Sequence, residues 1–395
     1  MTKKVLFYHD EFPCGGAEKV TIDIADYVSS FNYEIYVITS VAHINIPSNL
    51  KVFELPSKKN LNNTENFNFI VNLIQTLDIA IFVLPIHLNL SLLEWIKTKT
   101  NCKLIFSLHS TPFWEVISQL YTKKKKAKGN ILKTLEWFLL TYPKTKWLRK
   151  YDRTIQNDHL RIYNIVDAYT VLCDKYRDSL QEKLQLPKQL NKFHVIQNSQ
   201  KVISNVNLKK KQQVLYVGRL NYDDKRVDRL LHIWKLIYHR VPDWELVIVG
   251  DGTEKQELQQ MTIKMKLQNV RFAGYQIDPS PFYRDASILC LTSNFEGWGI
   301  VLTEAQANGV IPFAFNCAAG IEEIIGTSER YGFLITPYNL KEYGQKLLNL
   351  MNNPNKMNMM HRLVLQKAKE YSSEAVGKKW MSLFDSLNDS ASKAL

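Results

Sequence analysis

Residues 291–309 read LTSNFEGWGIVLTEAQANG, which places a Gly-rich turn directly before a helical pattern. The apolar run at 288–291 predicts a short buried strand ahead of the turn. Gly297 and Gly299 let the backbone turn sharply and approach a ligand closely, and an apolar stripe from Ile300 onward favours a helix ending near 309. A strand, a Gly-rich turn and a helix N-terminus direct N–H groups to one place, where a phosphate fits.

Two carboxylates accompany this turn. Glu296 lies in the turn and Glu304 about one turn inside the helix, so we expect them at different depths of one cleft and not as a tight dyad. Two unrelated acids at a helix start are the alternative interpretation, because acids favour the first turn anyway.

The spacing of Glu296 and Glu304, with Gly-Trp-Gly between them, resembles the E-x7-E motif of the retaining nucleotide-sugar glycosyltransferases of family 4, of the polysaccharide and lipopolysaccharide type. The resemblance implies the GT-B fold. It also implies that Glu296 contacts the transferred sugar and that Glu304 holds the ribose hydroxyls of the nucleotide. Four further donor-binding residues follow from it: Gly297, Trp298, Gly299 and Ile300.

The composition fits an ordinary globular protein. A chain of 395 residues predicts two domains, and its 45% hydrophobic and 23% charged residues supply a large core. The first apolar run, at 5–8, is too short for a signal peptide, and no run of 18 apolar residues occurs. The five cysteines form no Cys-x-x-Cys pair, which favours free thiols in a reducing cytoplasm over a zinc site.

Apolar strand-like runs alternate with helical patterns along the whole chain, which predicts an α/β fold of doubly wound parallel sheets. We expect strands at 5–9, 34–39, 52–55, 79–84, 103–109, 168–173 and 193–198, and helices at 17–30, 66–76, 90–99 and 175–184. The polar stretch 199–211 predicts a linker. Strands are then expected at 214–218, 246–250, 270–273, 288–291, 311–315 and 332–335, and helices at 227–240, 253–266, 300–309, 340–351, 354–371 and 374–387.

The predicted organisation is therefore two Rossmann-like domains that face each other across a cleft. Residues 1–199 form an N-terminal domain on the acceptor side, with a basic and aromatic insertion at 110–160. Residues 200–372 form the C-terminal domain that binds the nucleotide sugar, with ligands at the carboxyl ends of the strands. The resemblance implies that the last helix, in 373–395, returns to the N-terminal domain.

Two loops of the N-terminal domain carry candidate residues. Gly15 and Gly16 follow the first strand and open the first helix, where the backbone can approach a phosphate. They resemble the Gly-Gly-x-Glu beside the donor diphosphate in family 4. His109 ends a central strand, and the resemblance implies contact with the sugar or the acceptor. A structural histidine bonded to the backbone is the alternative, and His9 is a weaker candidate on the same geometric ground.

The C-terminal domain carries candidates for donor binding. Arg219, which follows Gly218 at the end of a strand, and Lys225 are two cations that can neutralise a diphosphate leaving group, and Arg226 competes for that role. The resemblance supports the pair of Arg219 and Lys225. Three more residues resemble positions near the nucleotide base: Gly250, Gly252 and Tyr275.

Positive charge is concentrated in residues 121–153, which hold eleven Lys and Arg against two acids, a net charge of +9 of the chain's +13. Trp114, Trp137, Phe138, Tyr142, Trp147 and Tyr151 lie in or beside this segment. Aromatic rings among Lys and Arg suit an anionic membrane surface. A solvated loop is one alternative, and a nucleic-acid surface is another, which we disfavour beside a nucleotide-sugar site.

We therefore expect a retaining glycosyltransferase that moves a hexose from a nucleotide sugar, with a UDP-sugar preferred, to a glycan or lipid-linked glycan. No metal or other cofactor is expected, since Arg219, Lys225 and helix-start N–H groups can offset the leaving-group charge. The expected location is cytoplasmic, peripheral to the inner face of the cell membrane. The alternative is a catalytically inactive subunit of a glycosylation complex. A nicotinamide oxidoreductase is disfavoured, because residues 14–17 do not match Gly-x-Gly-x-x-Gly.

Overall fold

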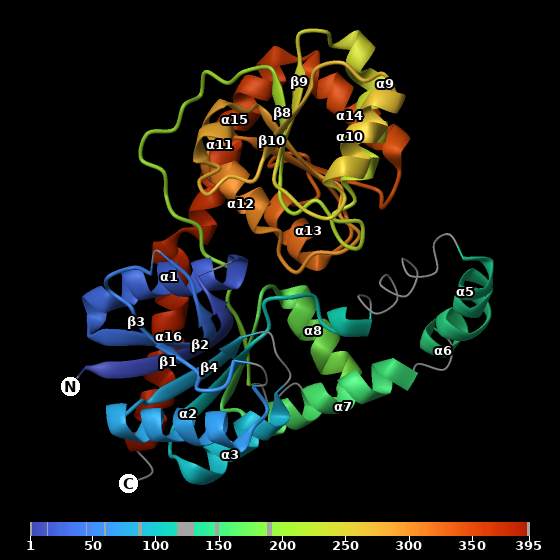
Figure 1. Cartoon of the computed structure of the whole chain (residues 1–395). Coiled ribbons are helices and arrows are strands. Elements are labelled where there is room, and N and C mark those ends of the chain that lie inside the picture. The colour runs from blue at the N-terminus through green and yellow to red at the C-terminus, as the bar shows by residue number, and fades with distance from the viewer. Residues whose placement is uncertain are drawn as a thin grey trace. The chain divides into compact units, whose positions relative to one another are not determined.

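The structure, a computed structural model, describes residues 2–13, 15–44, 46–58, 61–85, 89–116, 130–146, 150–187 and 192–392. The chain divides into two compact units. The first comprises Met1–Phe113, Arg149–Lys201 and Tyr371–Leu395, and the second comprises Trp114–Leu148 and Val202–Glu370. Each unit contains one parallel sheet with helices packed around it (Figure 1).

In the first unit the strand order is β3-β2-β1-β4-β5-β6-β7, with all neighbours parallel. The strands are β1 (Lys3–Phe12), β2 (Tyr33–Ala42), β3 (Lys51–Glu54), β4 (Ile81–Pro85), β5 (Lys103–Ser107), β6 (Ala168–Val171) and β7 (Phe193–Val195). The α-helices are α1 (Gly16–Val28), α2 (Thr64–Leu77), α3 (Leu90–Lys99), α7 (Lys150–Ile165), α8 (Asp174–Lys183) and α16 (Ser373–Ser392). Short 3-10 turns at Ser29–Phe31 and Lys369–Tyr371 follow α1 and precede α16.

In the second unit the strand order is β10-β9-β8-β11-β12-β13, again parallel throughout. The strands are β8 (Gln213–Val217), β9 (Glu245–Val249), β10 (Val270–Gly274), β11 (Ile288–Leu291), β12 (Ile311–Phe315) and β13 (Phe333–Ile335). The helices around them are α9 (Val227–Ile237), the 3-10 turn Tyr238–Arg240, α10 (Lys255–Lys264), α11 (Ser280–Asp285), α12 (Ile300–Ala307), α13 (Ala319–Ile325), α14 (Leu340–Met351) and α15 (Pro354–Ala368). Residues 130–146 add α5 (Ile131–Glu136), a π-helical turn (Trp137–Thr141) and α6 (Tyr142–Lys146).

The strands form because they are short apolar runs that helices can cover on both faces. Every residue of β4, β6, β11 and β12 is buried, as expected for parallel strands covered on both faces. Each strand segment that the sequence predicts is a strand in the structure, and the predicted doubly wound α/β class is confirmed. Among the described residues, no helix is both long enough and apolar enough to cross a membrane.

The helices that the sequence analysis missed have physical reasons for their presence. α7 lies partly inside the predicted insertion at 110–160, yet it is the crossover helix that joins the parallel neighbours β5 and β6, and it packs against α3. The structure thus divides 110–160 between the two units instead of keeping it as one insertion in the first. α11 and α13 have only six and seven residues, which is too short for a periodic pattern to be recognised.

The last helix, α16, packs against α1 in the first unit. A Cβ atom at Gly377 would lie 2.2 Å from the ring of Tyr27, so the glycine permits this close approach of α16. Trp380 packs against Phe7 of β1, with ring centroids 6.1 Å apart, and both rings are buried. The C-terminal helix therefore completes the core of the N-terminal unit.

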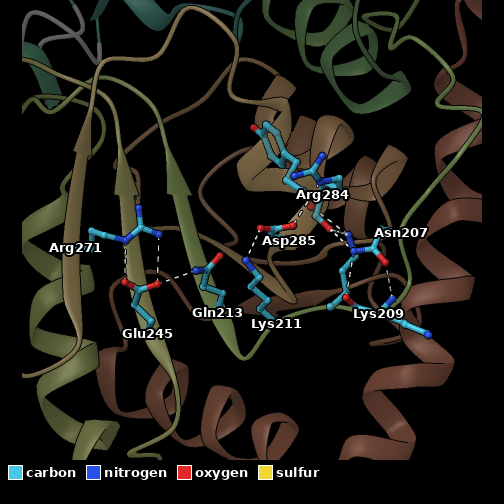
Figure 2. A network of polar contacts seen from close by, with 10 residues as sticks. Asn207, Lys209, Lys211, Gln213, Glu245, Arg271, Arg284 and Asp285 are labelled. Atoms are coloured by element: carbon cyan, nitrogen blue, oxygen red, sulfur yellow. Dashed lines mark hydrogen bonds and ion pairs between the residues drawn. The ribbon is translucent and has the colours of Figure 1, made fainter.

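Polar contacts fix the amino-terminal edge of the sheet in the second unit, as Figure 2 shows. Glu245 accepts hydrogen bonds from Gln213, at 2.7 Å, and from Arg271, at 2.8 Å, which ties β8, β9 and β10 together. Lys211 forms a 2.7 Å ion pair with Asp285 at the end of α11. The preceding Lys210 donates to the carbonyl oxygens of Tyr283, Arg284 and Asn308, and its burial lowers its pKa to about 8. The basic end of the predicted linker is thus bonded to the second unit.

Buried histidines make stability depend on pH, and two of them lie outside the candidate site. His159 contacts the hydroxyl of Tyr169, and His361 contacts the carbonyl of Gly309; burial lowers the pKa of each to about 4. In the unfolded chain a histidine takes up a proton near pH 6.5, whereas these two histidines in the folded protein take one up only near pH 4. Each therefore lowers the free energy of unfolding as the pH falls from about 6.5 towards 4, by on the order of 3 kcal/mol once the fall is complete.

We expect the free energy of unfolding, measured by urea denaturation, to fall between pH 7 and pH 4.5. The fall should be smaller in His361→Gln, because that variant no longer buries a group that protonates on unfolding. His239→Gln, at an exposed position, is the matched control and should keep the wild-type dependence. An identical pH dependence in all three proteins would contradict the assignment.

Candidate functional site

The candidate residues of the second unit gather at the carboxyl edge of its sheet. The chain runs from β8 outward through β9 to β10, then returns to form β11 on the other side of β8. Such a reversal of direction leaves a crevice beyond the strand ends, which is where open α/β sheets bind ligands. The loops after β8 and β11 meet at this point, and they carry Arg219, Lys225 and Glu296.

Lys225 and Glu296 form an ion pair across these two loops. The Lys225 Nζ lies 2.6 Å from Glu296 Oε1, and the Ser293 hydroxyl donates to the same oxygen at 2.7 Å. Glu296 is buried and Lys225 is nearly so, which strengthens their interaction over that of an exposed pair. The ammonium group has three donors, so it can hold Glu296 and an anionic ligand at the same time.

Two side chains that the sequence analysis did not single out join the same loops. The backbone N–H of Asn294 donates to the carbonyl of Asp224 at 2.6 Å, and its side-chain amide donates to the carbonyl of Asp223 at 2.8 Å. The Thr292 hydroxyl donates to the carbonyl of Arg226 at 3.0 Å. These bonds fix the backbone on both sides of Lys225 and therefore set where its ammonium group reaches.

The three candidate cations differ in their partners and in their exposure. Arg226 makes a bidentate pair with Asp228, at 2.9 and 2.8 Å, and lies over the ring of Tyr222. Arg219 makes one 3.1 Å contact with Asp224, and its side chain is 75% exposed. The side chain of Arg219 thus exposes most of its N–H donors to solvent. Arg219 and Lys225 are therefore better placed than Arg226 to bind an anion.

Glu304, on α12, has a partner on α11. The Tyr283 hydroxyl donates to Glu304 Oε2 at 2.7 Å, and burial raises the pKa of Tyr283 well above its usual value of 10, so it stays protonated. Helix α12 begins after Gly299, which has a φ of 85°, a left-handed conformation that favours glycine. Trp298 is buried beside this turn, and Ile300 is the first residue of the helix. Tyr283 is a residue of this site that no sequence pattern indicated.

The glycines of the site are explained by backbone packing. A Cβ atom at Gly250 would lie 1.9 Å from the carbonyl oxygen of Gly218, and one at Gly252 would lie 2.4 Å from that of Leu220. The loop after β9 therefore rests directly on the loop after β8. In the same way a Cβ atom at Gly320 would lie 2.4 Å from the carbonyl oxygen of Gly297. These glycines thus allow two close contacts, between the β9 and β8 loops and between α13 and the loop after β11. Tyr275, which follows β10, is 71% exposed.

The first unit has a similar reversal of strand direction between β1 and β4. Gly15 precedes α1 with a φ of 120°, and a Cβ atom there would lie 2.8 Å from Glu18 Oε2. Gly16 is the first residue of α1, whereas Cys14 lies outside the described residues. His9 is buried and contacts the Thr21 hydroxyl at 2.9 Å, so its side chain is held against α1.

His109 lies in a chain of hydrogen bonds after β5. Its Nδ1 is 2.8 Å from the Asn198 amide oxygen, which can only accept, so Nδ1 carries the proton. Its Nε2 is 3.1 Å from the Ser107 hydroxyl, which in turn is 2.6 Å from the hydroxyl of Thr170. Burial lowers the pKa of His109 to about 4, with Asn198 opposing the shift. Both ring nitrogens are bonded to side chains, so the structural interpretation accounts for His109 without a ligand.

Parts of the predicted basic segment lie outside the described residues, namely 117–129 and 147–149, which include Lys123–Lys126 and Trp147. Within the described part of the chain, no group of three or more His, Cys, Asp or Glu side chains is arranged to hold a metal ion.

Comparison with known families identifies the second unit. Residues 198–366 match the family described as "Glycosyl transferases group 1". An uncharacterized glycosyltransferase from Haemophilus influenzae is 26% identical over 384 residues, which cover 93% of this chain and 95% of the relative. The amylovoran biosynthesis glycosyltransferase AmsD of Erwinia amylovora is 29% identical over 227 residues, or 55% of this chain and 62% of the relative.

Solved structures identify the fold. The structure of HepE from Anabaena in complex with UDP and glucose superposes with a TM-score of 0.71 at 16% sequence identity, covering 97% of this chain and all of that one. The chain thus has the GT-B fold, and it resembles the glycosyltransferases of polysaccharide and lipopolysaccharide synthesis.

The contact between the β8 and β9 loops can be tested by adding one methyl group. Gly250→Ala should lower the free energy of unfolding by more than about 3 kcal/mol, because the new Cβ meets a carbonyl oxygen and the φ of 138° is strained. Gly274→Ala is the matched control: its φ is also positive, at 70°, but nothing lies within 4 Å of the added atom, so about 1–2 kcal/mol is expected. Equal losses in urea unfolding would contradict the packing explanation.

Proposed function

We propose that this chain, whose residues 198–366 match the group 1 glycosyl transferases and which has the GT-B fold, is a retaining glycosyltransferase. It transfers a hexose from a nucleotide sugar, preferably a UDP-sugar, to a glycan or lipid-linked glycan in the synthesis of cell-surface polysaccharide or glycolipid. The observation that carries the proposal is the 2.6 Å pair of Lys225 and Glu296, held between two loops where the strand order reverses. The UDP and glucose bound to the similar HepE fold favour a UDP-sugar.

In this proposal, the second unit has residues for the diphosphate, the ribose and the base of the nucleotide sugar. Arg219 and Lys225 supply cationic donors for the diphosphate, and the N–H groups at the start of α12 add the positive end of a helix. Glu304, held by Tyr283, is placed to accept hydrogen bonds from the ribose hydroxyls. The loops with Gly250, Gly252 and Tyr275 are the proposed neighbours of the base, with Tyr275 exposed for contact.

Retention of configuration follows from attack on the face that the diphosphate leaves. The bond from the sugar C1 to the diphosphate oxygen breaks, the acceptor oxygen forms the new bond to C1, and the acceptor proton passes to the diphosphate. Lys225 and Arg219 stabilise the negative charge that develops on that oxygen, and no metal is needed in this scheme. Glu296 contacts the sugar; its two bonds to Lys225 and Ser293 hold it in position.

The first unit is the proposed acceptor side. Gly15 and Gly16 place the N-terminus of α1 where an anion can bind, and His109 presents a neutral ring fixed by Asn198. Because both ring nitrogens are bonded to side chains, the ring can contact a sugar without taking a proton from it. The basic segment 121–153 supports work at an anionic membrane surface, and we place the enzyme in the cytoplasm at the inner face of the cell membrane.

Nucleotide binding tests the role of Glu304. Glu304→Ala should weaken the affinity for the nucleotide by roughly 1.5–3 kcal/mol, the contribution of hydrogen bonds to a charged group. Tyr283→Phe removes only the bond that orients Glu304 and should weaken it by about 0.5–1.5 kcal/mol. Glu257→Ala on α10 is the control. The measurement is thermal shift and calorimetric titration with a panel of nucleotides and nucleotide sugars, and wild-type affinity in folded Glu304→Ala would refute the assignment.

Turnover tests the role of the two cations. Arg219→Ala and Lys225→Ala should each lower kcat by about a hundredfold or more, as the loss of one preorganised donor does. Lys255→Ala, which removes the ion-pair partner of the exposed Asp251, should have little effect. Activity should persist in EDTA. Loss of activity on chelation that manganese restores would show that a metal supplies this charge. A wild-type protein that binds the donor but neither transfers nor hydrolyses its sugar would favour an inactive subunit.

A further inference from the structure

Residues 130–146 expose an unusual amount of apolar surface. The exposed large apolar side chains in this segment are Ile131, Leu132, Leu135, Phe138, Leu139, Leu140 and Tyr142. Ile131 is 80% exposed, Leu139 68% and Phe138 58%. Single exposed apolar residues are normal on a protein surface, but seven within twelve residues form a patch, and such patches mark interaction sites.

The segment is helical, which places most of these side chains on one face. Asn130 caps its start, with the side-chain oxygen accepting from the Lys133 N–H at 3.0 Å, and α5 continues through the π-helical turn into α6. Positions 131, 135, 138, 139 and 142 follow the spacing of one helix face. We call these five residues the apolar stripe. Trp137 is buried and supports the stripe by packing against Phe138 and Tyr142.

Positive charge lies on the same helix as the apolar stripe and in the flanking sequence. Lys133 and Lys144 are exposed on the helix itself, and residues 121–153 together carry +9. An apolar helix face beside Lys residues is complementary to an anionic lipid surface, with acyl chains for the apolar side chains and headgroups for the ammonium groups. The stripe contains three aliphatic side chains and two rings. A surface that stacks nucleic-acid bases would need aromatic side chains in their place.

We infer that the helix 131–146 lies in the plane of an anionic bilayer and inserts the apolar stripe below the headgroups. This goes beyond electrostatic attraction: charge brings the protein to the surface, and the stripe retains it there. The inference rests on the proposed function only in its choice of a membrane-presented acceptor. It assigns the helix the task of keeping the enzyme next to that acceptor.

The test compares two triple variants for binding to vesicles. The stripe variant is Leu135→Ser, Phe138→Ser and Leu139→Ser. The control variant changes three exposed apolar residues elsewhere: Ile44→Ser, Val202→Ser and Ile263→Ser. Mixed phosphatidylcholine–phosphatidylglycerol vesicles should bind the wild type and the control alike, and the stripe variant at least about tenfold more weakly. Part of the wild-type binding should survive high salt, because the burial of apolar surface is not screened.

A depth measurement separates insertion from adsorption. A tryptophan placed by Leu139→Trp should give emission that lipids with brominated acyl chains quench beyond the wild-type level. Equal binding of the stripe variant and the wild type, binding fully abolished by salt, or no added quenching would each overturn the inference. So would a wild type that is dimeric without vesicles while the stripe variant is monomeric, since the stripe would then join two copies. Salt-sensitive binding to single-stranded DNA in place of vesicles would also overturn it.

The proposed function fails in a different way. The stripe variant should bind the nucleotide sugar as the wild type does, because residues 131–146 lie outside the donor-binding loops. Vesicle insertion without donor binding would reject the glycosyltransferase and leave the membrane helix standing.

Discussion

The ion pair of Lys225 and Glu296 depends on the order of the strands in the second sheet, and the arrangement of the site depends on that pair. Because β8 is followed by β9 on one side and has β11 on the other, the loops that leave β8 and β11 start side by side at the carboxyl edge of the sheet. A lysine on one loop and a glutamate on the other then satisfy each other in a place where an isolated charge would be costly. Asn294 and Thr292 donate hydrogen bonds that hold the backbones of the two loops together. These bonds fix the positions from which the side chains of Lys225 and Glu296 reach each other.

A diphosphate that enters this place meets charges that are already oriented. Lys225 is held by Glu296, and Arg219 is bonded to Asp224 while most of its guanidinium group faces solvent. Little reorganisation is then needed when the leaving group acquires charge, which is the condition under which fixed charges accelerate a reaction most. Glu304 is oriented in a similar way, because the protonated hydroxyl of Tyr283 donates to one oxygen of its carboxylate.

The histidine network of the first unit serves orientation in a different way. His109 is bonded to side chains at both nitrogens, and its tautomer is fixed by an amide oxygen that cannot donate. A histidine with a pKa near 4 remains neutral at physiological pH, so it acts as a polar surface of known direction and not as a base. Thr170, Ser107 and Asn198 come from three segments of the chain, and therefore only the folded sheet brings them to His109.

The sequence alone determined the strands, their parallel arrangement and the loops that carry the candidate residues, because buried strands are short apolar runs and glycines mark sharp turns. It did not reveal the partners of those residues. Tyr283 and Asn294 bond to residues 21 and 71 positions away, and Ser293, three residues before Glu296, belongs to no recognised motif. The sequence also left Arg226 in competition with Arg219 and Lys225, which only its bidentate pair with Asp228 distinguishes in space. The sequence placed Gly250 and Gly252 near the nucleotide base by resemblance, and the structure adds that both glycines admit a neighbouring backbone. The contacts of Tyr283, Asn294 and the two glycines needed the tertiary structure, because each joins segments that the folded sheet, and not the adjacent sequence, brings together.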